Sequence, residues 1–292
     1  MKLEGTFTAL VTPFHPDGSL DLDSLSGLVE WQIESGVEGL VPCGSTGESA
    51  TLSHAEHARV VRHVVEAAAG RVPVIAGTGS NSTEEALELT HSARDAGAAA
   101  ALLISPYYNK PTQEGLYLHY RRIAEETGLP LVLYNIPGRT ASRIEPETIA
   151  RLSGLPGIVG LKEAGGDLGK TSDTLAAADP DFVVLSGDDA LTLPMMAIGG
   201  RGVICTTSNV APRPMGDLVR AELRGDRATA RRIHFELLPL MNALFLETNP
   251  IPVKTAVEII GRIPDATLRL PLTEMQKTKR DALEAVLASL HP

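Results

Sequence analysis

The sequence predicts an α/β fold, a (β/α)8 TIM barrel with a C-terminal helical extension. Eight short segments rich in aliphatic and β-branched residues recur along the 292 residues, with helical patterns between them. Each segment is nearly continuous in apolar residues, which is typical of parallel strands covered by helices. A doubly wound open sheet is the structural alternative, but the nearest match to its G-x-G-x-x-G fingerprint, at residues 77–82, lacks the third glycine.

The eight expected strands are aliphatic and β-branched runs separated by helical patterns. A barrel of eight strand and helix units occupies ~250 residues, so the chain is long enough to contain one. The expected strands cover residues 7–11, 39–42, 72–76, 100–104, 131–135, 158–162, 182–185 and 202–206.

Helices are expected between the strands because capping residues mark where several of them begin and end. Asp21, Ser53 and either Ser82 or Thr83 precede helical patterns, and each has a side-chain oxygen that can accept a backbone N–H of the first turn. Glycine suits the conformation at a helix C terminus. Four glycines close such patterns: Gly36, Gly70, Gly97 and Gly128.

The chain continues well past the eighth unit. Three further helical patterns cover residues 224–245, 251–260 and 273–290, which is more than one barrel helix needs. No linker rich in glycine, serine or proline precedes them, so a separately folded domain is not expected. We therefore expect a catalytic barrel over residues 1–223 and a helical region over residues 224–292 that packs on it.

Charge and cysteine content exclude several classes of function. The chain has 26 Lys plus Arg against 36 Asp plus Glu, a formal net charge of −10, which argues against a nucleic-acid partner. Cys43 and Cys205 lie in apolar runs and are expected to be buried thiols, too few for a disulfide framework or a four-cysteine zinc site. The N-terminal residues lack a signal-peptide pattern and no apolar stretch reaches ~20 residues, so we expect a cytoplasmic protein without a membrane partner.

One lysine stands at the end of an apolar strand. Lys162 closes the segment IVGLK, so its side chain is expected to point into the barrel, where loss of hydration lowers the pKa of the ammonium group. The neutral amine is a nucleophile that forms an imine with a ketone. An ion pair with Glu163 or another carboxylate is an equally good interpretation of position alone.

Two other strand ends carry polar groups suited to catalysis. Tyr134 and Arg139, in YNIPGRT, offer a proton relay and a planar fork for a carboxylate, although a core tyrosine and a surface arginine would look the same. Ser45 and Thr46, in GSTGES, add two hydroxyls and several N–H groups that suit an anion. A tight turn without a ligand is the alternative for this segment.

Three further pairs of residues have explanations that need no catalytic role. Tyr107 and Tyr108 follow the fourth strand and suggest a contact between subunits. Asp188 and Asp189 follow the seventh strand as helix caps. Two histidines in SHAEH share a helical face, make a poor metal site and are expected to face solvent; they are His54 and His57.

Taken in order, the motifs GSTGES, PYYNKPTQEG, YNIPGRT, GLKEA, LSGDD, GVICTTSNV and NPIPVK resemble the pyruvate-dependent Schiff-base aldolases, specifically the dihydrodipicolinate synthase branch. The resemblance runs from about residue 5 to 270. It implies a (β/α)8 barrel with a C-terminal helical region, and condensation of pyruvate with L-aspartate 4-semialdehyde on the route to L-lysine, without a metal or organic cofactor. A sugar-acid aldolase of the N-acetylneuraminate lyase type and a non-catalytic effector-binding barrel are the alternatives.

The resemblance also implies a role for each site residue. Lys162 forms the imine and Tyr134 relays protons. Position 45 is commonly threonine in the synthases and serine in the lyases, and serine keeps the hydroxyl but loses the β-branch. The matching positions are catalytic for Lys162, Tyr134, Ser45 and Tyr108, the last acting in a neighbouring subunit, and substrate-binding for Thr46, Arg139, Gly187 and Ile204.

Feedback inhibition is a further implication of the resemblance. In synthases inhibited by L-lysine, the effector binds at a subunit interface, and we expect the same here, with a homotetramer built as a dimer of dimers. Arg139 and this effector pattern disfavour the sugar-acid aldolase, and Lys162 disfavours a non-catalytic barrel. The matching effector positions are Ser49, Ala50, His54, His57, Asn81, Glu85 and Tyr107.

Overall fold

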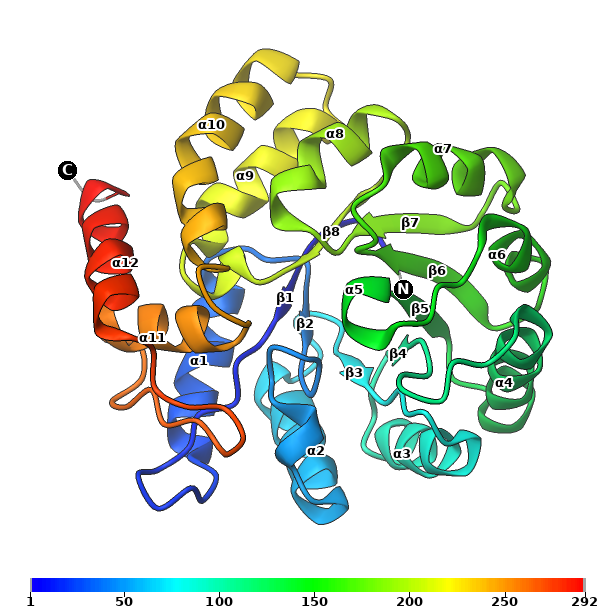
Figure 1. Ribbon diagram of the computed structural model, residues 1–292, viewed down its shortest axis with the longest axis horizontal. Coiled ribbons are helices and arrows are strands. Elements are labelled where there is room, and N and C mark those ends of the chain that lie inside the picture. Colours follow the sequence, from blue (N-terminus) through cyan, green and yellow to red (C-terminus); the bar gives the residue numbers. More distant parts are fainter. Residues whose placement is uncertain (1, 291–292) are drawn as a thin grey trace.

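Eight parallel strands form one sheet that curls into a ring in the computed structural model, which describes residues 2–290 (Figure 1). Their order is β2-β1-β8-β7-β6-β5-β4-β3, and an isolated parallel bridge between Leu40 and Val74 joins the two ends. The predicted barrel is therefore confirmed. The strands are β1 (Gly5–Ala9), β2 (Gly39–Val41), β3 (Ile75–Gly77), β4 (Ala100–Ile104), β5 (Leu131–Asn135), β6 (Ile158–Glu163), β7 (Val183–Ser186) and β8 (Gly202–Cys205).

Two strands begin two or more residues from the expected position, and β7 begins one residue late, at Val183. The β3 strand begins at Ile75 and not at residue 72, because Pro73 has no N–H to donate to a ladder. Its carbonyl still accepts the N–H of Leu40 at 3.0 Å, which ties the segment before β3 to β2. The β1 strand begins at Gly5, two residues early, since the N–H of Gly5 donates to the Arg201 carbonyl at 3.0 Å.

Helices surround the ring, and their ends follow the capping residues. Asp21 accepts the N–H of Ser24, Ser53 forms a capping box with Glu56, and Ser82, not Thr83, caps the third helix. The four glycines expected at helix ends all have positive φ. The α-helices are α1 (Leu22–Glu34), α2 (His54–Ala68), α3 (Thr83–Asp95), α4 (Gln113–Thr127), α5 (Pro137–Thr140), α6 (Pro146–Ser153), α7 (Leu168–Ala177), α8 (Thr192–Ala197), α9 (Pro212–Leu223), α10 (Arg227–Ala243), α11 (Ile251–Ile259) and α12 (Lys277–Leu290).

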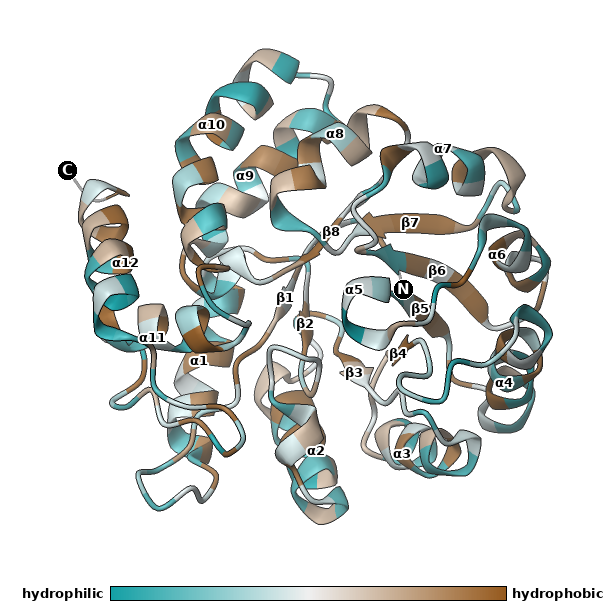
Figure 2. Cartoon of the chain, in the orientation of Figure 1, coloured by the Kyte–Doolittle hydropathy of each residue, from teal (hydrophilic) through white to brown (hydrophobic). Residues whose placement is uncertain are grey.

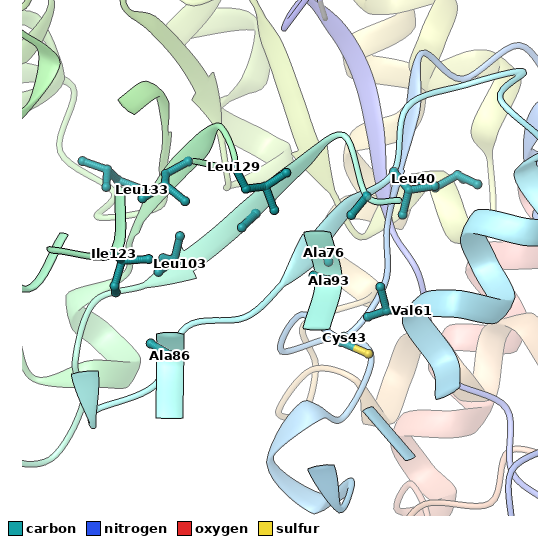
Figure 3. Close-up of a cluster of buried hydrophobic side chains, with 14 of the residues drawn as sticks. Leu40, Cys43, Val61, Ala76, Ala86, Ala93, Leu103, Ile123, Leu129 and Leu133 are labelled. Carbon is teal, nitrogen blue, oxygen red and sulfur yellow. The ribbon is translucent and has the colours of Figure 1, made fainter. Parts of the chain in front are cut away.

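The hydrophobic core has an inner and an outer layer. Alternate strand residues point to opposite sides of the sheet. The strands are mostly apolar, whereas polar and apolar residues alternate along the helices (Figure 2). Outward side chains such as Leu40, Ala76, Leu103 and Leu133 join a buried cluster with residues of α2, α3 and α4 (Figure 3). The side chains that fill the ring include Phe7, Val41, Ile75, Leu102, Val132, Leu185 and Ile204.

The C-terminal helices extend the fold on one side of the ring. The helix expected over residues 224–245 is α10, which begins later because Gly225 has a φ of +79° and Asp226 caps the first turn. The α10, α11 and α12 helices pack around a second buried cluster that includes Leu240, Val253 and Leu283 (Figure 1). None of the helices within residues 2–290 is long and apolar enough to cross a bilayer.

Candidate active site

Lys162 lies inside the barrel, on the strand that the sequence indicated. It is the fifth residue of β6, where it pairs with Tyr134 of β5 and Leu185 of β7. Leu161 belongs to the outer cluster, so the alternation of the strand turns Lys162 inward. The Nζ atom lies 4.3 Å from the centroid of the Tyr134 ring, and the side chain is buried.

Burial makes the Lys162 amine unusually easy to deprotonate. Loss of hydration lowers its pKa from 10.5 to about 8, while the negative charge of Asp189 partly opposes the shift. Among residues 2–290 no carboxylate oxygen lies within 4.0 Å of Nζ. Glu163 accepts hydrogen bonds from Asn135 Nδ2 at 2.9 Å and from the N–H of Gly165 at 2.5 Å. The interpretation of Lys162 as an ion-pair partner of Glu163 is therefore wrong.

Tyr134 has the protonation state that a relay needs. Burial raises the pKa of its phenol to about 12, so the hydroxyl keeps its proton near neutral pH. Ser45, from the segment after β2, lines the same cavity as Tyr134, and its side chain lowers the pKa of the phenol against the effect of burial. The structure thus brings together two hydroxyls and the Lys162 amine from three different strands.

Gly187 lies against Lys162, and Ile204 belongs to the group of side chains that fills the ring. A β-carbon on Gly187 would lie 2.8 Å from both Cγ and Cε of Lys162, so only glycine leaves room for the lysine side chain. The N–H of Gly187 donates to the Glu163 carbonyl at 2.7 Å, which fixes this close approach. Ile204 is fully buried on β8, inside the ring.

Thr46 and Arg139 are joined through a residue of the C-terminal region. Asn249 Nδ2 donates to the Thr46 hydroxyl at 3.0 Å, and the Asn249 carbonyl accepts from Arg139 Nη2 at 2.9 Å. No carboxylate within residues 2–290 lies within 4.0 Å of the Arg139 guanidinium. Its remaining N–H groups are therefore available to a ligand carboxylate.

Asp188 and Asp189 have different roles, although the sequence suggested the same one. Asp188 caps the short helix that follows β7, by accepting the N–H of Ala190. Asp189 is buried and accepts the N–H of Thr206 at 3.1 Å and the N–H of Thr207 at 2.6 Å. The cap prediction is wrong for Asp189, which is the charged group near Lys162 that sequence reasoning missed.

Tyr108 does not join the other catalytic candidates within one chain. Its side chain is 88% exposed, and its backbone has a φ of +74°. Tyr107, beside it, lines a cavity of about 450 Å³ that Ser45, Tyr134 and Arg139 line as well. The two adjacent tyrosines thus differ in their access to the site.

The same cavity reaches the residues expected to bind an effector. His54 Nε2 and Glu85 Oε1 are 2.8 Å apart, and Asn81 Nδ2 donates to the Tyr107 carbonyl at 3.1 Å. The solvent-facing prediction is wrong for His57, which is buried with Nε2 2.7 Å from the Gly77 carbonyl. Six of the seven expected residues line the cavity: Ser49, Ala50, His54, His57, Glu85 and Tyr107.

A second buried lysine lies at the end of the NPIPVK motif. Lys254 has no exposed side-chain area, and burial lowers its pKa to about 8, as for Lys162. Its Nζ lies 2.7 Å from Oε1 of Glu48, which is equally buried. Because this amine is paired with a carboxylate, Lys162 is the better nucleophile.

No group of three or more His, Cys, Asp and Glu side chains that could hold a metal ion occurs in the part of the chain described, residues 2–290. Cys43 and Cys205 are free, buried thiols, and burial raises the pKa of each. Neither is a reactive thiolate near neutral pH. The groups gathered at the site include the Lys162 amine, the Arg139 guanidinium and the hydroxyls of Ser45, Thr46 and Tyr134.

Comparison with known proteins gives one consistent result. Residues 2–290 match the model of the dihydrodipicolinate synthetase family. The 4-hydroxy-tetrahydrodipicolinate synthase of Nitratidesulfovibrio vulgaris strain DP4 is 56% identical over 290 residues, which covers 99% of each chain. Lys162, Tyr134 and Arg139 all lie within these matched regions.

Two solved structures are similar to the whole chain. One is the chloride-inhibited dihydrodipicolinate synthase of Acinetobacter baumannii complexed with pyruvate, with 45% identity, a TM-score of 0.97 and 99% of each chain covered. The other is the dihydrodipicolinate synthase of Cyanidioschyzon merolae with lysine bound, with 40% identity, a TM-score of 0.95 and 98% of each chain covered.

Proposed function

The chain belongs to the dihydrodipicolinate synthetase family, and from that premise we propose that it is a lyase that condenses pyruvate with L-aspartate 4-semialdehyde to 4-hydroxy-tetrahydrodipicolinate. The observation that carries the proposal is Lys162, a buried amine with a pKa of about 8 and no carboxylate partner among residues 2–290. It lies at the C-terminal end of a barrel strand, where such barrels place their chemistry.

The reaction begins at the Lys162 amine. The neutral amine attacks the pyruvate ketone and expels one water, which leaves a protonated imine. Loss of a proton from C3 of pyruvate gives an enamine, which attacks the aldehyde carbon of the semialdehyde. The amino group of the semialdehyde then adds to the imine carbon and displaces Lys162, closing the ring. The sum is one molecule of each substrate giving one product and one water.

Tyr134 and Ser45 move the protons between these steps. Both side chains line one cavity, which gives a path from C3 of the imine to the aldehyde oxygen, and the raised pKa of Tyr134 keeps the phenol protonated until a proton is required. Tyr108 of the partner subunit completes the relay. Its 88% exposed side chain is consistent with a group that acts in a neighbouring molecule.

Two groups bind the carboxylates of the substrates. The Thr46 hydroxyl and adjacent backbone hold the pyruvate carboxylate, and Arg139 holds the carboxylate of the semialdehyde through the bidentate geometry of a guanidinium. Gly187 and Ile204 shape the pocket around the imine. Arg139, free of protein carboxylates within residues 2–290, is the feature that favours the semialdehyde over a neutral sugar chain.

L-Lysine inhibits the enzyme from the far end of the cavity. Glu85 receives the ammonium of the effector, since its carboxylate is held by Ser80 and His54 with a lowered pKa and stays charged. Tyr107 lines the same cavity as Tyr134, which connects the two regions. The effector residues are Ser49, Ala50, His54, His57, Asn81, Glu85 and Tyr107.

The enzyme assembles as a homotetramer, a dimer of dimers, in which the interface within each dimer brings Tyr108 to the partner's site. Of the residues that the structure describes, those up to 223 form the catalytic barrel and those from 224 to 290 form the helical region packed on it. The cytoplasm is its place of action, where pyruvate is available and both buried thiols stay reduced.

Product analysis tests the proposal. Incubation with pyruvate and L-aspartate 4-semialdehyde should consume both in a 1:1 ratio and yield a product whose mass is their sum less one water. The same preparation should not cleave N-acetylneuraminate. Cleavage of the sugar acid with no reaction of the semialdehyde would instead establish the lyase alternative, and inertness toward both would support a non-catalytic barrel.

A further inference from the structure

We propose that Asn249 is a positioning residue that directs the hydroxyl hydrogen of Thr46 toward the carboxylate of pyruvate. The inference rests on the proposed function, since it assigns a task to Thr46 in that reaction. Asn249 lies in the segment between α10 and α11, and no motif at a strand end pointed to it.

Asn249 touches both groups assigned to substrate carboxylates. Its side chain donates from Nδ2 to the Thr46 hydroxyl at 3.0 Å, and its carbonyl accepts from Arg139 Nη2 at 2.9 Å. Thr46 follows β2 and Arg139 follows β5, so one residue of the C-terminal region links two separate strand ends. Asn249 is buried and lines the cavity that Tyr134 also lines.

The direction of the hydrogen bond carries the inference. A hydroxyl has one hydrogen to donate and two lone pairs that accept. Because Nδ2 of Asn249 occupies a lone pair of Thr46, the hydroxyl hydrogen must point elsewhere. Its other protein neighbour, the Thr206 hydroxyl, is 3.5 Å away, at the outer limit of a hydrogen bond. The hydrogen is therefore free for an incoming carboxylate.

The side-chain oxygen of Asn249 also supports a functional role for this residue. Oδ1 of Asn249 is buried and has no hydrogen-bond partner within residues 2–290. Buried amide oxygens are normally paired, and an unpaired one lowers stability. Packing alone does not explain an amide whose one side-chain hydrogen bond to the described residues is the bond that orients Thr46.

A buried ion pair holds the two segments together. Glu48, two residues after Thr46, binds Lys254, five residues after Asn249, at 2.7 Å, and both side chains are fully buried. The second oxygen of Glu48 accepts the N–H of Arg269 at 3.2 Å. This ion pair thus holds the segments that carry Asn249 and Thr46 in a fixed relative position.

Trapping of the imine with borohydride at a series of pyruvate concentrations tests the inference without the second substrate. Asn249→Asp replaces the donor by a carboxylate, which takes the Thr46 hydrogen and repels pyruvate. We expect the pyruvate concentration for half-maximal labelling of Lys162 to rise about tenfold or more. Asn242→Asp adds the same charge at an exposed position of α10 and should leave it unchanged.

A double-mutant cycle shows whether Asn249 acts through Thr46. Asn249→Ala and Thr46→Val should each raise the half-saturating pyruvate concentration about threefold to tenfold, and the double variant should be no worse than Thr46→Val alone. If the Asn249→Ala variant does not fold, Asn249→Ser takes its place in the cycle. Half-saturation of Asn249→Asp within twofold of wild type, or fully additive effects in the cycle, would overturn the inference. A wild-type protein that pyruvate and borohydride do not label would instead refute the proposed function.

Discussion

Gly187 stands so close to Lys162 that a β-carbon there would lie 2.8 Å from both Cγ and Cε of the lysine. A glycine immediately after β7 therefore leaves the space through which the side chain of Lys162, on the neighbouring strand, extends. The position that shapes the pocket and the position that carries the nucleophile depend on each other.

Gly187→Ala should displace the Lys162 side chain and slow imine formation, with kcat/KM lower by about tenfold or more, since small misplacements of reacting groups have large effects. Steady-state kinetics and borohydride labelling measure this. Gly27→Ala is the matched control, because Gly27 lies exposed in α1 with open space around its Cα. Equal activity of both alanine variants would contradict the close approach.

The rate of imine formation should rise with pH and level off above about pH 8. Only the neutral amine attacks the ketone, and a lysine with a pKa of about 8 is neutral in about one molecule in ten at pH 7, against about one in 3,000 for a pKa of 10.5. Stopped-flow measurement between pH 6 and 9.5 checks this. A rate still rising tenfold per unit at pH 9.5 would show an ordinary lysine.

Asp189→Asn provides the internal control for that profile. The negative charge of Asp189 favours the ammonium form of Lys162 and so raises its pKa against the effect of burial. Removing the charge should move the inflection of the profile to lower pH. An inflection that stays in place, or moves upward, would mean that Asp189 does not act on Lys162.

The buried pair of Lys254 and Glu48 should matter for stability. Lys254→Met leaves the Glu48 carboxylate buried and unpaired, and should lower the free energy of unfolding by about 3–5 kcal/mol. Combination with Glu48→Gln should recover much of the loss. Urea unfolding measures both. The control is Lys170→Met, at the half-exposed pair with Glu145, which should change the free energy of unfolding by less than about 1 kcal/mol. Similar losses of stability at both sites would contradict the special role of the buried pair.

Tyr134→Phe should separate proton relay from imine formation. The ring remains in contact with Lys162, so labelling by pyruvate and borohydride should persist, whereas turnover should fall about 100-fold or more without the phenol. Exchange of the pyruvate C3 hydrogens in deuterated water, followed by NMR, should slow in parallel. Turnover within tenfold of wild type would remove Tyr134 from the relay.

The barrel and the strand-end residues could be predicted because they depend on local patterns. Apolar runs mark strands, and the alternation of a strand turns Lys162 inward once Leu161 is taken as outward. Tyr134 pairs with Lys162 in the sheet because each stands one residue before the end of its strand, and the two strands are neighbours. Differences at strand ends were small, and the two larger ones followed from Pro73 and Gly5.

The contacts of the C-terminal region could not be predicted in the same way. Asn249 and Thr46 are 203 residues apart, and Lys254 and Glu48 are 206 apart, so no local pattern relates them. A lysine at the end of NPIPVK resembles a surface residue of a short helix until the fold places a carboxylate beside it. Asp189 likewise differs from Asp188 only through the backbone of the segment after β8.

Mass mapping of the protein reduced with borohydride in the presence of pyruvate tests the central claim most directly. The account predicts a single modification, the reduced pyruvate adduct, on the peptide that contains Lys162, with Lys254 unmodified despite its similar pKa. Absence of the adduct, or an adduct on any other lysine, would contradict the assignment of Lys162 as the nucleophile.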